Sequence, residues 1–228
     1  MKQPIYPKNI AYSLSNSSTH NESATLKQLR HRGASVELPE KPNPTSKVSH
    51  LQRNKPSLTP IITVQMCSSK LKKLPLAVTQ CVHAKALILA FNELEALPTE
   101  IGNMHNLEYL YLNFNRLKGL PNAIKYASKL KALTLVGNGL QQIPSQAFEL
   151  HQLCWLDMSF NKISHLPENI GALTKLKTLT LSHNYIRTIP KSIASLAQLK
   201  YLSLQGNFLT GKEKEKVNNL LPNTQIKF

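Results

Sequence analysis

From residue 61 onward, apolar and polar positions repeat with a period of 23 residues. The shared pattern is LxxLxLxxNxLxxLPxxI, and its copies follow one another without a gap. The alternating LxL segment predicts a short strand whose leucines face inward and whose intervening residues face solvent. One such strand cannot bury its apolar side alone, so stacked copies predict a parallel sheet over a continuous core. The copies begin at Ile61 (the weakest), Ala84, Leu107, Leu130, Leu153, Leu176 and Leu199.

Two further columns predict how the chain leaves each strand and returns to the next. An asparagine follows each strand, where its carboxamide can donate to and accept from loop backbone that would otherwise be buried unpaired. A proline follows on the outer path, where no ladder N–H is needed; prolines at this spacing exclude a helical bundle. The asparagines are Asn92, Asn115, Asn138, Asn161, Asn184 and Asn207. The prolines are Pro75, Pro98, Pro121, Pro144, Pro167 and Pro190.

This repeat resembles the 23-residue class of intracellular leucine-rich repeat proteins, which includes Ras-pathway scaffolds and their plant and bacterial relatives. The segments LPTEIGNMHNL and LPENIGALTKL are especially similar, and the resemblance spans about residues 61–211. It implies an α/β fold, a right-handed solenoid of about seven repeats with a parallel sheet on the concave face. For function it implies a protein-binding concave surface with no fixed partner.

The ends of the array differ from the repeats. The N-terminal region contains a polar low-complexity tract, SLSNSSTHNES, and a Pro-rich stretch, LPEKPNPTSK. Residues 1–46 are therefore predicted to be a mostly disordered tail and linker. The alternative is that this region is a docking or targeting peptide. Residues 47–60 are predicted to form a degenerate N-terminal cap. At the other end, Val217, Leu220 and Leu221 share one helical face, so residues 212–228 predict a capping helix, stopped at Pro222, and a tail.

The solvent-facing strand positions define the candidate binding surface. Large aromatic residues with a polar atom concentrate there, although leucine and isoleucine already fill the core positions, and such residues commonly anchor protein interfaces. Ordinary surface filling is the alternative. Three phenylalanines each precede an asparagine of the repeated column: Phe91, Phe114 and Phe160. They either lie at the edge of this surface or pack on the turn. The predicted partner-binding residues are Tyr109, Tyr111, Thr134, Trp155, Asp157 and Tyr201.

Charge adds a second candidate surface. The chain holds 28 Lys and Arg against 12 Asp and Glu, a net charge of +16 that attracts anionic surfaces. Asp157 is the only charged residue in the three solvent-facing columns of the repeats. A group of basic residues of the repeats lies in loops after the strands, and we call this group the basic flank. Because the flank lies apart from the aromatic cluster, we do not expect nucleic-acid binding. A protein that binds an anionic surface or a nucleic acid through the flank is a lesser alternative. The flank comprises Lys70, Lys72, Lys73, Arg116, Lys118, Lys162 and Arg187.

Enzyme signatures are missing. The sequence has no GxGxxG, P-loop, HExxH or GxSxG motif, and its histidines fall in different repeat phases. Cys154 lies within the repeat period, which favours a filler thiol over a nucleophile. We therefore expect no catalysis, cofactor, metal or small-molecule substrate.

These observations favour a cytoplasmic, monomeric protein that binds a protein partner as an adaptor, scaffold or inhibitor. The three cysteines form no CxxC pair, and no apolar run reaches signal-peptide or membrane-spanning length. The competing hypothesis is a secreted bacterial effector, delivered into a host cell, that binds a host protein. Its support is a C-terminal pattern in which Glu213 and Glu215 precede Ile226.

Overall fold

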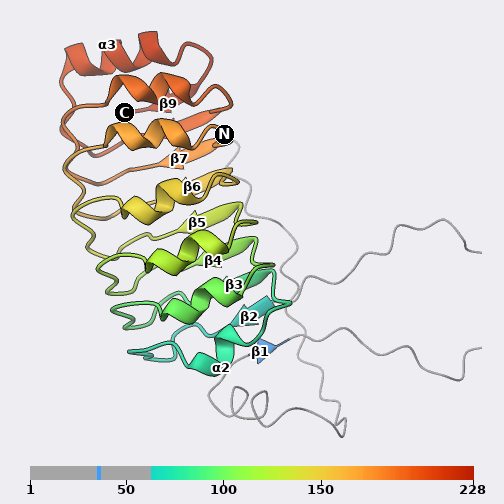
Figure 1. Cartoon of the computed structure of the whole chain (residues 1–228). Helices are drawn as coiled ribbons and strands as arrows, with labels where there is room; N and C mark the ends of the chain where they lie inside the picture. The colour runs from blue at the N-terminus through green and yellow to red at the C-terminus, as the bar shows by residue number, and fades with distance from the viewer. Residues whose placement is uncertain (1–34, 37–62) are drawn as a thin grey trace, which may run out of the picture.

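The computed structural model describes residues 35–36 and 63–228. These residues form a solenoid in which each unit runs from a strand through a loop to a short helix, stacked from β2 to α3 (Figure 1). Apart from Ser35–Val36, the predicted tail of residues 1–46 and the predicted cap of residues 47–60 lie outside the described residues. Ser35–Val36 form a two-residue strand, β1, that pairs antiparallel with the first strand of the array.

The seven strands predicted by the repeat are present and parallel, which confirms the predicted solenoid. Neighbouring strands pair in register one repeat apart, as Leu110 does with Leu133. The order along the sheet is the order along the chain, from β1 to β9. The seven strands are β2 (Thr63–Gln65), β3 (Ala86–Ile88), β4 (Tyr109–Tyr111), β5 (Ala132–Thr134), β6 (Trp155–Asp157), β7 (Thr178–Thr180) and β8 (Tyr201–Ser203).

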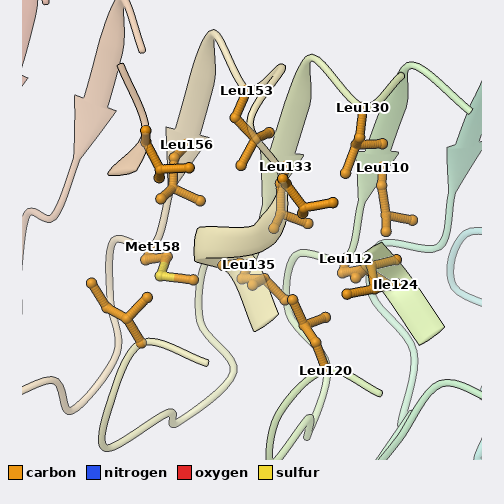
Figure 2. Close-up of a cluster of buried hydrophobic side chains, with 14 of the residues drawn as sticks. Leu110, Leu112, Leu120, Ile124, Leu130, Leu133, Leu135, Leu153, Leu156 and Met158 are labelled. Carbon is orange, nitrogen blue, oxygen red and sulfur yellow. The ribbon is translucent and has the colours of Figure 1, made fainter. Parts of the chain in front are cut away.

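The core lies between this sheet and the short helices on the outer side. Leu110 and Leu112, the two inward leucines of one unit, are fully buried, and so is Ile124 from the outer wall of the same unit. Figure 2 shows these side chains beside their equivalents in the next units, Leu133 and Leu156. Because each unit contributes the same apolar positions, one hydrophobic cluster runs the length of the described array.

The asparagine column joins each unit to the one before it. The Asn138 Nδ2 group donates to the Leu112 carbonyl of the preceding unit and to the Leu135 carbonyl of its own unit, both at 3.0 Å. Its Oδ1 atom accepts from the Leu117 N–H group of the preceding unit at 3.2 Å. Asn207 makes equivalent bonds but is less buried. Each carboxamide therefore pairs buried backbone atoms on both sides of a unit boundary.

The proline column starts the helical turns of the outer wall. The Pro121 carbonyl accepts from the Ile124 N–H group at 3.0 Å, an i to i+3 bond that opens a 3₁₀ turn and places Ile124 in the core. Proline suits this point because its φ is preset, here to −70°, and no strand partner needs its missing N–H group. The outer elements are α2 (Leu76–Thr79) and the 3₁₀ helices η1 (Thr99–Asn103), η2 (Asn122–Tyr126), η3 (Ser145–Glu149), η4 (Glu168–Ala172) and η5 (Lys191–Ser195).

The C-terminal end contains the expected helix and an unexpected strand. Helix α3 (Gly211–Leu220) begins after Thr210, whose side chain accepts from the Glu213 N–H group, and it buries Val217. The segment after Pro222 was expected to be a tail, but β9 (Gln225–Lys227) pairs parallel with β8. The pairing of Tyr201 with Gln225 gives an offset of 24 residues, one more than the repeat period.

We expect replacement of Asn138 by leucine to lower the free energy of unfolding by about 1–3 kcal/mol, because the backbone groups it pairs stay buried. The same replacement at Asn207 should have a smaller effect, because that position is partly exposed. Denaturant titration measures both. Two variants as stable as the unsubstituted protein would show that the ladder does not stabilise the array.

Strand β9 offers a second test of the fold. Ile226 packs against the core whereas Gln225, its neighbour on the same strand, is exposed. Ile226→Asp should therefore destabilise the protein by about 1–3 kcal/mol, since it places a charge against apolar side chains. Gln225→Asp adds the same charge at the surface and should change stability by less than about 0.5 kcal/mol. Equal melting temperatures for the two variants would mean that β9 does not pack on the array in solution.

Candidate functional site

Three neighbouring strands bring five of the six predicted partner-binding residues together. Tyr109 and Tyr111 lie on β4, Thr134 lies on β5, and Trp155 and Asp157 lie on β6. Tyr111 pairs in register with Thr134, which pairs with Asp157. These side chains face outward because the leucines between them, such as Leu110 and Leu156, face the core.

Tyr111 and Trp155 contact each other across β5. Their ring centroids lie 6.5 Å apart and their planes make an angle of 74°, an edge-to-face arrangement. The residues of the intervening strand on this face are small, and they are almost covered: Ala132 is 3% exposed and Thr134 is 2% exposed. Large residues on β4 and β6 thus close over small residues on β5, and the aromatic pair forms the centre of the face.

Asp157 lies half-buried beside this pair. Its Oδ1 atom accepts from the Ser159 N–H group at 2.9 Å. Burial raises the pKa of the Asp157 carboxyl, and hydrogen bonds from Ser159 and Thr180 oppose the shift. Among the described residues, no lysine, arginine or histidine forms an ion pair with this carboxylate. The carboxylate is therefore held in place by hydrogen bonds without a neutralising charge.

Thr134 adds an unpaired polar atom to the same place. Its Oγ1 atom is buried and has no hydrogen-bond partner in the structure. Buried hydroxyl groups are usually paired, because an unpaired one loses its bonds to water without replacement. The repeat pattern does not predict that this hydroxyl is unpaired, because threonine is common at strand positions.

Tyr201 lies apart from the other five residues. It is on β8, two strands beyond Trp155, and Lys227 of β9 lies over its ring with Nζ 6.0 Å from the ring centroid. Lys227 therefore adds a positive charge to the sheet beyond the repeats. The sequence analysis missed it because β9 is out of phase with the 23-residue period; the alternation in QIKF was the only signal.

The edge of the sheet after the strands carries exposed aromatic rings as well as the basic flank. Phe91 (58% exposed) stacks on Phe114 (45% exposed) with centroids 4.7 Å apart, and Phe160 stacks on His183 at 4.4 Å. These four residues have a left-handed backbone, with φ between 54° and 58°. The three phenylalanines therefore rim the face instead of packing into the turn.

Gly137 and Gly206 occupy the same turn position in the two units that follow these ring pairs. A Cβ atom at Gly137 would lie 2.7 Å from Phe114 Cδ1, and one at Gly206 would lie 2.5 Å from His183 Nδ1. Each stack therefore ends where a ring lies over a glycine. This part of the rim separates into two short aromatic segments.

The basic flank surrounds these rings, and part of it is paired. Arg116 forms an ion pair with Glu93 at 3.2 Å, and Lys118 lies 3.8 Å from Glu95 of the preceding unit. Lys162 and Arg187 are exposed on the same edge. The separation of aromatic and basic residues that was expected from the sequence thus holds for the tyrosines and tryptophan of the sheet, but not for the phenylalanines of the rim.

Comparison with known families agrees with this architecture. Two family models match the chain: one described as a leucine rich repeat, over residues 82–140, and one described as a leucine-rich repeat region, over residues 142–220. The protein belongs to the leucine-rich repeat family. A comparison with curated proteins gives no match.

Solved structures of leucine-rich repeat proteins are similar. A leucine-rich repeat protein of Leptospira interrogans is 35% identical with a TM-score of 0.67, over 70% of this chain and 41% of its own. An internalin of Listeria monocytogenes is 26% identical with a TM-score of 0.60, over 68% of this chain and 44% of its own. A plant peptide hormone receptor, solved in complex with RGF2, is 27% identical with a TM-score of 0.57, over 68% of this chain and 26% of its own. The chain matches less than half of each.

Three further observations concern the described residues of this leucine-rich repeat protein. No helix there is long and apolar enough to cross a membrane. Nor do three or more His, Cys, Asp or Glu side chains of these residues gather where they could hold a metal ion. Cys67, Cys81 and Cys154 are free and partly buried.

The raised pKa of Asp157 makes stability depend on pH with a defined sign. A carboxyl whose pKa is higher in the folded state destabilises the fold above that pKa, and the penalty disappears below the unfolded value near 3.8. Asp157→Asn keeps an acceptor for the Ser159 N–H group and removes the charge. We expect its melting temperature to equal or exceed that of the unsubstituted protein at pH 7, with the difference closing toward pH 4.

Thermal melts between pH 4 and pH 8 measure this difference, and Asp157→Ala is the control because it removes the acceptor as well. The alanine variant should melt below the asparagine variant across the range. If Asp157→Asn melted lower than the unsubstituted protein at pH 7 and the gap narrowed on acidification, the charge would stabilise the fold instead.

Proposed function

We propose that this chain is a non-enzymatic protein-interaction module, an adaptor, scaffold or inhibitor that holds a protein partner against the concave sheet. The observation that carries the proposal is the aromatic pair of Tyr111 and Trp155, joined across two small residues at the centre of the face. Tyr109, Thr134 and Asp157 complete the site, and Tyr201 is a separate contact farther along the face.

The position of the aromatic residues supports a binding role. With strands about 4.8 Å apart, β4 to β6 span about 10 Å, so one patch of a partner can contact the four partly exposed side chains, while Thr134 lies covered beneath them. Tyrosine and tryptophan offer large apolar area, a polar atom and few rotatable bonds, which favours them as interface anchors. The sheet beneath them is rigid because β4 and β6, which carry the two rings, each hydrogen-bond to β5. The pair is therefore preorganised for contact.

The comparisons support the class of function and not a partner. The similar plant structure is a peptide hormone receptor in complex with RGF2, so this fold binds another molecule in at least one relative. Because the chain covers 26% of that receptor and 41% of the Leptospira protein, the identity of a partner does not transfer.

The edge of the sheet after the strands, which carries the stacked rings and the basic flank, is a second candidate surface, which we call the rim. Phe160 and His183 stack on the same edge as the exposed residues Lys162 and Arg187, a combination of rings and positive charge that suits an anionic partner. Elsewhere on this edge, Arg116 and Lys118 already pair with carboxylates. We therefore assign the rim an electrostatic role around the concave site.

Truncation of the aromatic pair tests the proposal. The full chain is immobilised to capture partners from an extract of its source cells, and affinities for a captured protein are then measured by calorimetry. We expect Tyr111→Ala and Trp155→Ala each to weaken binding by at least about tenfold, because a truncated central anchor often costs about 2 kcal/mol or more. Melting temperatures should stay within about 4 °C, since both side chains lie outside the core.

Two sets of controls accompany this series. Tyr126→Ala removes an exposed tyrosine from η2 on the outer wall and should bind as the unsubstituted protein does. Charge reversal at Lys72, Lys118 and Arg187 should alter mainly the salt dependence of association, as expected for charges at a rim. If charge reversal abolished binding while both aromatic variants bound normally, the partner would bind the basic flank and not the concave site.

A further inference from the structure

Asp157 is unusual in both its charge and its surroundings. It is the only charged residue in the three solvent-facing columns of the repeats, in a protein with a net charge of +16. Two positive charges elsewhere on the sheet have partners: Lys131 Nζ lies 2.7 Å from Glu108 Oε2, and Lys227 lies over Tyr201. The Asp157 carboxylate has no such cation among the described residues, so its charge is available to a partner.

The groups around this carboxylate favour a cation. Trp155 lies two residues before it on the same side of β6, and Tyr111 contacts Trp155 from β4. Aromatic faces attract positive charge, and tryptophan attracts it most strongly. An acidic side chain placed here would meet both the carboxylate and the negative ring faces, and an apolar one would bury the charge further without pairing it. A positive group is the one class of side chain that satisfies both features.

The hydrogen bonds of the carboxylate give an independent indication. The Asp157 carboxylate accepts hydrogen bonds from Ser159 and Thr180, and all of these donors are uncharged. A lysine ammonium carries three donors and an arginine guanidinium carries five, and both bring the positive charge that the present donors lack. Neutral residues carry fewer donors and no compensating charge.

We propose that Asp157, Trp155 and Tyr111 form a receptor for a basic side chain, through which the protein recognises a lysine or arginine of its partner. This inference rests on the proposed function, because it names the chemistry of the partner at the concave site. The carboxylate pairs with the positive group, and the Trp155 ring covers its alkyl stem.

The single tryptophan of the chain makes this inference testable without a known partner. Trp155 is the only tryptophan, so the fluorescence of the full-length protein reports this site alone. The probes are N-acetyl-lysine methylamide and N-acetyl-arginine methylamide, with N-acetyl-norleucine methylamide as the uncharged control and N-acetyl-glutamate methylamide as the acidic control. All are titrated at one ionic strength. We expect saturable changes for both basic probes, with dissociation constants about tenfold below that of the norleucine probe, and none for the glutamate probe.

Two variants separate charge from structure. Asp157→Asn keeps the acceptor for Ser159 and should remove the tenfold preference for basic probes over the norleucine probe. Glu149→Gln removes the same charge from an exposed position on η3 and should behave as the unsubstituted protein. Equal responses to all four probes, a preference for the glutamate probe, no response to any probe, or an undiminished preference in Asp157→Asn would each overturn the inference.

The proposed function can fail separately. A captured protein that is lost from Trp155→Ala but retained with full affinity by Asp157→Asn would leave the concave site in place and overturn the basic-residue receptor. Conversely, a site with the expected probe preference would stand even if partners bound through the rim. The two results are measured on the same set of variants.

Discussion

The asparagine ladder is the interaction on which the rest of the structure depends. A chain that turns away from a parallel sheet after three residues leaves backbone donors and acceptors inside the protein, where water cannot pair them. Each ladder carboxamide pairs such groups in its own unit and in the unit before it, as Asn138 does with Leu135 and Leu112. The strand can therefore be short, the leucines can all face one core, and the remaining strand positions are left to vary on the concave face.

Much of this architecture follows from the sequence because it repeats. The leucine, asparagine and proline columns each carry one physical requirement, and each requirement recurs at a fixed spacing, so strands and turns could be placed before the structure was known. Strand β9 could not, because helix α3 replaces the usual outer turn and shifts Ile226 out of phase by one residue. The alternation of Gln225, Ile226 and Lys227 was too short to indicate a strand by itself.

The candidate site was harder to predict for a related reason. Column positions indicated that Tyr111, Trp155 and Asp157 share a face, but side-chain contacts depend on the sizes of the residues between them. The edge-to-face contact requires small residues on β5, and the unpaired Thr134 hydroxyl has no counterpart in any pattern. Tyr201 met the same column rule, yet it lies beside Lys227 of β9 and not beside the other aromatic residues. Periodicity locates a surface, and the residues that differ between units decide what that surface can recognise.

The offsets within the ladder also bear on how such a protein can change over evolution. Asn138 bonds to carbonyl and amide groups 26 and 21 residues earlier, and Asn161 and Asn184 use the same two offsets. Duplicating or deleting one whole 23-residue unit preserves both offsets at every boundary, whereas an insertion of another length within a unit breaks them at that unit. A gene encoding this array can therefore lengthen its concave face by unequal recombination in steps of about 4.8 Å, without redesigning the core.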